Sequence, residues 1–150
     1  MKLAEGLLLR SEYQQKLEGI QQRILKNLKV QEGDEPGEYP ETLLKEYSKI
    51  NEELSFLVTQ INACNQQKIL DDGRTISEAL IAREEMVRKR KLLVLIQSTA
   101  TDSNFRRTRA EIKIKTTVNI SRLQREIDHL SKEFRKLDTL IRKTNWSVDL

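Results

Sequence analysis

Two stretches of the chain carry apolar residues at alternating spacings of three and four, and this feature most restricts what the chain can fold into. One stretch lies within residues 41–65 and the other within residues 119–143. A seven-residue apolar repeat puts a continuous apolar stripe on a helix and favours a second helix packed along it. We call these stripes the first and the second seam. The first consists of Leu43, Tyr47, Ile50, Leu54, Leu57 and Ile61, and the second of Ile120, Leu123, Ile127, Leu130, Phe134, Leu137 and Ile141.

Two further helices are expected, over residues 2–28 and 75–98. The helix over 75–98 should begin with a capping box, because Thr75 is followed three residues later by Glu78. Asn119 is the expected N-cap of the last helix. Loops are expected over residues 31–40, which contain both prolines, and over residues 99–109.

The helix over 75–98 has a less regular apolar pattern than the two seams. Arg83 and Arg90 fall on its apolar side at a spacing of seven residues. Either these arginines lie at the edge of the helix contact with their charges in water, or they meet carboxylates across it. We favour the edge, with Glu52, Glu53 and Glu126 as the partners to consider otherwise.

A small β element is expected near residues 110–118, where apolar or β-branched residues alternate with charged or polar ones. Ile112, Ile114, Thr116 and Val118 would share one face of this strand. A single strand leaves backbone groups unpaired, so it would need a partner. Three are open: residues 67–70, a second copy, or a hairpin around Asn104.

Together these elements predict a mostly α protein, an elongated antiparallel four-helix coiled-coil-like bundle forming one domain over residues 1–150. We expect the two seam helices to pair, with the other two completing the layer. Four slender helices make a thin core, so a second subunit is expected to cover the remaining apolar surface. The chain should form a homo-oligomer, with a dimer as the default and higher assemblies open.

The residue types that carry enzyme chemistry are scarce. The single histidine, His129, should face solvent, and the single cysteine, Cys64, should fill space on the first seam. No catalytic, cofactor-binding or metal-binding set is predicted, and we expect no enzyme activity and no cofactor. No apolar run is long enough to span a membrane, and the start does not fit an export signal, which favours a cytoplasmic location.

Charge is unevenly distributed along the chain. Residues 1–75 have 10 basic and 13 acidic side chains, whereas residues 76–150 have 17 and 10. Opposite signs in the two halves could guide folding back or pairing with a reversed copy. The basic residues also raise an alternative, nonspecific nucleic-acid binding. The candidates are Arg88, Lys89, Arg90, Lys91, Arg106, Arg107 and Arg109.

Several segments resemble an uncharacterised family of small bacterial proteins, some of whose members are labelled septicolysin. The segments are the start at residues 1–10, the loops at 30–36 and 70–75, Glu111-Ile112-Lys113, the Val118-Asn119 helix entry and Thr144-Asn145-Trp146. The resemblance covers nearly the whole chain and implies a bacterial origin and a helical fold. The label itself implies a cytolysin, a third functional alternative.

The residues therefore favour a non-enzymatic, self-associating helical scaffold or protein-interaction module. Nucleic-acid association is the first alternative, and another protein partner remains open.

Overall fold

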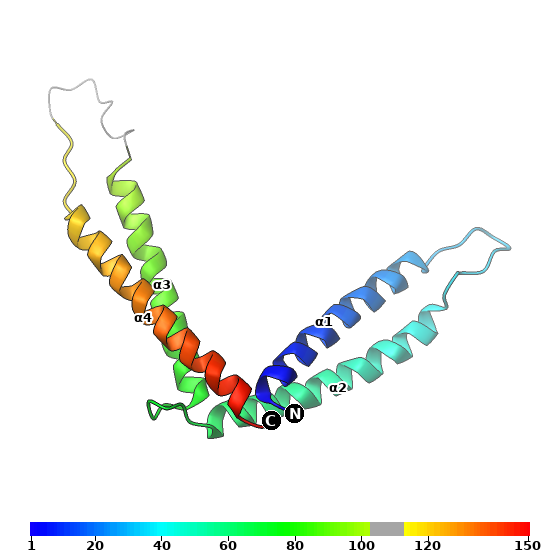
Figure 1. Cartoon of the computed structure of the whole chain (residues 1–150). Helices are drawn as coiled ribbons and strands as arrows, with labels where there is room; N and C mark the ends of the chain where they lie inside the picture. Colours follow the sequence, from blue (N-terminus) through cyan, green and yellow to red (C-terminus); the bar gives the residue numbers. More distant parts are fainter. Residues whose placement is uncertain (103–112) are drawn as a thin grey trace. The chain divides into compact units, whose positions relative to one another are not determined.

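The computed structural model describes residues 1–102 and 113–150, which form four long helices (Figure 1). They are α1 (Leu3–Lys26), α2 (Pro40–Gln67), α3 (Ile76–Ala100) and α4 (Ile120–Ser147). This confirms the expected mostly α fold, in which the helices pack against one another.

Local signals set where the helices begin. Pro40 occupies the first turn of α2, where its missing N–H costs nothing. In α3 the backbone N–H of Glu78 donates to Thr75 Oγ1, and the N–H of Thr75 donates to Glu78 Oε2, which confirms the capping box. The backbone N–H of Arg122 donates to Asn119 Oδ1, as the expected N-cap requires.

The chain divides into two compact units, described separately below. The first unit comprises residues 1–69 and 142–150. Within it α1 packs along α2, and Arg23 near the end of α1 forms an ion pair with Glu38 just before α2. The first residues bond to the last ones, since Leu3 N donates to Val148 O and Leu150 N donates to Met1 O. Leu17, Ile20, Leu43 and Ile61 are among the buried core residues of this unit.

The second unit comprises residues 70–141, in which α3 packs along the larger part of α4 (Figure 1). Its buried residues include Ile76, Ala79 and Leu93 from α3 and Ile127 and Leu137 from α4. Side-chain hydrogen bonds join Arg83 to Asp138 near one end and Gln97 to Gln124 near the other, so the helices are antiparallel.

Each seam helix thus packs along its neighbour in the chain, α2 along α1 and α4 along α3, whereas the sequence favours pairing of the two seam helices. Neighbouring elements joined by a short connection usually pack side by side, and the connection after α1 covers only residues 27–39. Among the described residues, no helix combines the length and the apolar character needed to cross a membrane.

The prediction of a small β element near residues 110–118 is wrong for residues 113–118, which form no strand; residues 110–112 lie outside the described residues. Alternating residues stabilise a strand only when a neighbouring strand takes up the backbone groups. Residues 113–117 are exposed and have no such neighbour among the described residues, so the alternation yields an irregular segment that ends in a bend at 117–118.

Candidate interaction surfaces

The face of α3 that packs on α4 carries its own seven-residue repeat, which includes polar residues. Its positions follow spacings of three and four: Ile76, Ala79, Arg83, Met86, Arg90, Leu93, Gln97 and Ala100. Ile76, Ala79 and Leu93 are buried, and the others are half-buried or, in the case of Arg90, exposed at the edge. The apolar members alone form no clean repeat, so the sequence pattern did not reveal this face.

Three side-chain hydrogen bonds connect the polar positions of α3 to α4 at steps of seven residues. Arg83 Nη1 donates to Asp138 Oδ1 at 2.7 Å. Arg90 Nε donates to Ser131 Oγ at 2.8 Å, and Gln97 Nε2 donates to Gln124 Oε1 at 2.7 Å. Because each donor has one acceptor opposite it, the three bonds together fix the register of the antiparallel pair.

The interpretation that Arg83 lies at the edge of the helix contact, without a carboxylate partner, is therefore wrong. Its partner is Asp138, whose side chain is only 17% exposed. The guanidinium can be partly buried here because the ion pair with this aspartate offsets the cost of removing it from water. Arg90 bonds to a hydroxyl instead of a carboxylate. Glu126, which the sequence offered as a partner for the arginines, forms its ion pair with Lys89 at 3.2 Å.

The thirteen residues of the two seams are all buried or half-buried in the chain. The buried ones are Leu43, Leu57, Ile61, Ile127, Leu137 and Ile141. The half-buried ones are Tyr47, Ile50, Leu54, Ile120, Leu123, Leu130 and Phe134. A Cβ placed on Gly6 of α1 would lie 3.8 Å from Leu57 Cδ1, so at this point the first seam faces α1.

The four cationic side chains at residues 88–91 point in different directions around α3, since consecutive helical residues are about 100° apart. Arg88 Nη1 lies 3.8 Å from Glu84 Oε2, Lys89 pairs with Glu126 and Arg90 bonds to Ser131. These side chains therefore do not form one cationic face. Arg106, Arg107 and Arg109, the remaining nucleic-acid candidates, lie outside the described residues.

A groove of about 600 Å³ runs beside the α3–α4 contact. Its lining combines apolar side chains with three cations and one hydroxyl: Met86, Val87, Arg90, Lys91, Val94, Ser131, Phe134 and Arg135. No carboxylate lines it. The groove has a charge suited to an anion but contains no nucleophile paired with a base.

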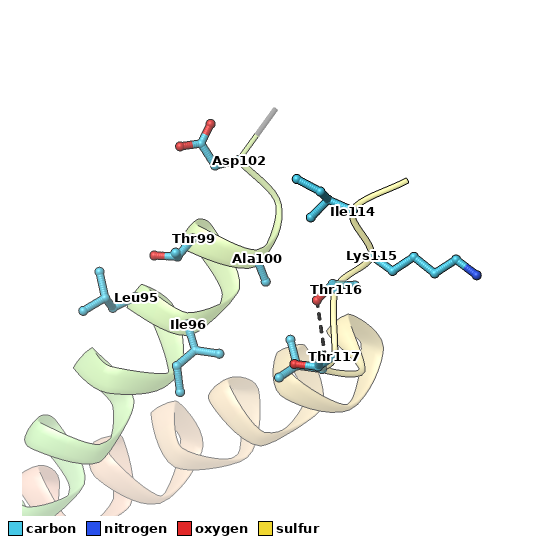
Figure 2. A pocket seen from close by; sticks show the side chains of 10 residues that line it. Leu95, Ile96, Thr99, Ala100, Asp102, Ile114, Lys115, Thr116 and Thr117 are labelled. Carbon is cyan, nitrogen blue, oxygen red and sulfur yellow. Dashed lines mark hydrogen bonds between the residues drawn. The ribbon is translucent and has the colours of Figure 1, made fainter. Parts of the chain in front are cut away.

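A second groove, of about 480 Å³, lies between the end of α3 and residues 114–118 (Figure 2). Leu95, Ile96 and Ala100 line it on the helix side. Figure 2 shows Ile114 directed toward α3 and Lys115 directed away from it. The groove is mostly apolar and brings together no set of residues that would perform catalysis.

Cys64 and His129 occupy the environments expected from the sequence. Cys64 is buried, its Sγ lies 3.8 Å from the carbonyl oxygen of Asp149, and burial raises the pKa of its thiol. His129 is exposed. Within residues 1–102 and 113–150, no cluster of three or more His, Cys, Asp or Glu side chains could hold a metal ion.

Outward-facing apolar residues on α3 are a feature that the seams did not indicate. Ile81, Leu92 and Leu95 are 63%, 56% and 60% exposed. They lie away from the face that packs on α4, and Leu95 also lines the groove beside residues 114–118. A search for a second stripe with the same spacings on this helix, polar positions included, would have found them.

Comparison with known proteins identifies relatives without a known activity. No curated protein matches the chain. A crystal structure described as that of a functionally unknown conserved protein from Corynebacterium diphtheriae is 34% identical, with a TM-score of 0.92 over 100% of this chain and 98% of the other. Neither this description nor that of the matching family mentions septicolysin, so that resemblance remains a prediction. Residues 10–150 match the model of a family of unknown function, DUF6847, and the chain belongs to this family.

Proposed function

We propose that this protein is a non-enzymatic helical module that self-associates and serves as a scaffold for other proteins. The observation that carries the proposal is the set of large apolar side chains exposed on α3, a helix whose other face is already packed on α4. Exposed apolar residues grouped on one face are typical of protein–protein contact sites. A cytoplasmic location is part of the proposal, since a single cysteine provides no internal disulfide framework of the kind found in exported small domains.

The two seams remain candidate assembly surfaces, and their burial favours a role inside the protomer. Leu54 and Leu130 are half-buried members of the first and the second seam. A glutamate at a position that packs inside the protomer would unfold the chain, whereas a glutamate at a subunit contact would give a smaller but folded species.

The experiment is sedimentation velocity over about 1–100 µM protein, the range in which modest interfaces dissociate. We expect the wild type to sediment above the 17.6 kDa of one chain at the upper concentrations. Leu54→Glu and Leu130→Glu are measured beside it, with circular dichroism to report folding. A wild type that sediments at 17.6 kDa throughout contradicts self-association.

Nucleic-acid binding is the second candidate, supported by the cations that line the groove beside α3 and α4. Arg90, Lys91 and Arg135 lie there without a carboxylate in the lining. Lys89 and Arg90, however, already bond to α4. The number of cations left to contact phosphates is therefore smaller than the run in the sequence suggests, and we rank this function below self-association.

A further inference from the structure

The outer face of α3 carries a second stripe at spacings of four, three, four and three, which we call the outer stripe. It consists of Ile81, Glu85, Arg88, Leu92 and Leu95. All five residues are exposed, so the stripe has no partner helix within the described residues of the second unit. Helix α3 thus has seven-residue repeats on two faces, and only one of them is packed.

Four of the five residues of the outer stripe, from Ile81 to Leu92, match one another when the direction of the helix is reversed. From Ile81 to Leu92 the order is apolar, acidic, basic, apolar, at spacings of four, three and four. In an antiparallel pair of such helices, Ile81 of each copy lies beside Leu92 of the other. Glu85 of each copy then lies beside Arg88 of the other, which gives two identical ion pairs related by a two-fold axis.

Charge also decides the direction of pairing. A parallel arrangement would bring the two copies of Glu85 together and the two copies of Arg88 together, and like charges directly opposite one another are unfavourable. Among the residues that the structure describes, the ion-pair contact of Arg88 is an exposed one with Glu84, at 3.8 Å. Such a contact contributes little, so exchanging it for one with the second copy costs little.

We propose that the outer stripe is the contact surface for a second copy of this chain, bound antiparallel through α3. This inference rests on the proposed function, since it names the surface through which the protein would self-associate. Apolar contacts between Ile81 and Leu92 supply the attraction, and the pairs between Glu85 and Arg88 set direction and register.

Reversing the two charges separately and together tests the proposal. Glu85→Arg brings two pairs of like positive charges together in the dimer, and Arg88→Glu brings two pairs of like negative charges together. We expect each single variant to weaken dimerisation at least about tenfold in sedimentation velocity. The double variant E85R/R88E restores opposite charges in exchanged positions, so its dimerisation should return to within about threefold of the wild type.

The matched controls carry the same charge changes elsewhere on exposed helix surface. They are Glu18→Arg on α1 and Lys132→Glu on α4. Both should dimerise like the wild type, and thermal unfolding followed by circular dichroism verifies that every variant folds. A single variant that unfolds contradicts the exposed position assigned to its residue.

The outcomes separate this inference from the proposed function. If both single variants dimerise as well as the wild type, the outer stripe is not the contact surface. Self-association would then occur through another surface, and the proposed function would stand. Single variants that dissociate without rescue in the double variant overturn the antiparallel register. A monomeric wild type overturns both proposals.

Discussion

Arg83 shows how a single polar residue can hold two helices in register. Its guanidinium donates to Asp138, whose side chain is only 17% exposed. Arg83→Met keeps the length of the side chain but removes the charge opposite Asp138, so we expect a loss of about 1–3 kcal/mol in the free energy of unfolding. Urea unfolding measures it. The double variant R83M/D138L should lose less than R83M alone, and an equal or larger loss would contradict a coupled pair.

Replacing glycine by alanine should change the free energy of unfolding in opposite directions at two positions. Gly73, in the turn before α3, has φ +89°, a conformation that side chains disfavour. Gly19 lies inside α1, and a Cβ there meets nothing within 4 Å. Gly73→Ala should therefore lower the free energy of unfolding by about 1 kcal/mol, and Gly19→Ala should raise it by about 0.5–1 kcal/mol. Thermal unfolding of both variants tests this prediction: the melting temperature should fall for Gly73→Ala and rise for Gly19→Ala. Melting temperatures that shift in the same direction would contradict it.

Among the elements, α2 and α4 were predictable because their repeats are almost purely apolar. The packing of α3 was not predictable, because Arg83, Arg90 and Gln97 occupy positions of its packed face that an apolar repeat would fill with apolar residues. Their hydrogen bonds to α4 explain why polar residues stand there. α4 continues to Ser147, beyond the expected end at 143, since no Gly or Pro follows Asn119 to stop it. The strand was mispredicted because alternation reports a local preference and says nothing about a pairing partner.

The cap of α3 gives a prediction at the scale of the element. Thr75→Ala removes the acceptor for the backbone N–H of Glu78 and should cost about 1 kcal/mol of unfolding free energy. Thr59→Ala is the matched control, because Thr59 lies inside α2 and its hydroxyl donates to the carbonyl of Ser55 in the same helix. Alanine is the better helix former there, so this control should be neutral or slightly stabilising in urea unfolding. Equal losses in the two variants would show that the cap contributes nothing specific.

For the whole molecule, the distribution of charge separates the two candidate functions by their response to salt. Residues 76–150 have 17 basic and 10 acidic side chains, so the carboxylates in this half offset much of its attraction for phosphate. Displacement of counterions by six or more cations would make duplex affinity fall about a thousandfold between 50 and 200 mM salt. Dimerisation through the outer stripe, with two exposed ion pairs beside apolar contacts, should weaken less than about tenfold over the same range.

We therefore expect a dimer at both salt concentrations and no binding of a mixed-sequence duplex at the higher one, measured by sedimentation velocity and by fluorescence anisotropy in the same buffers. Arg135→Glu, in the groove beside the α3–α4 contact, serves as the variant for duplex binding because it changes a groove cation outside the outer stripe. Nucleic-acid association would be favoured by tight duplex binding at 50 mM salt that falls steeply by 200 mM and that this variant abolishes. The protein would then also form no dimer at either salt concentration. A dimer that this variant leaves unchanged would instead be consistent with contact through the opposite, outer face of α3.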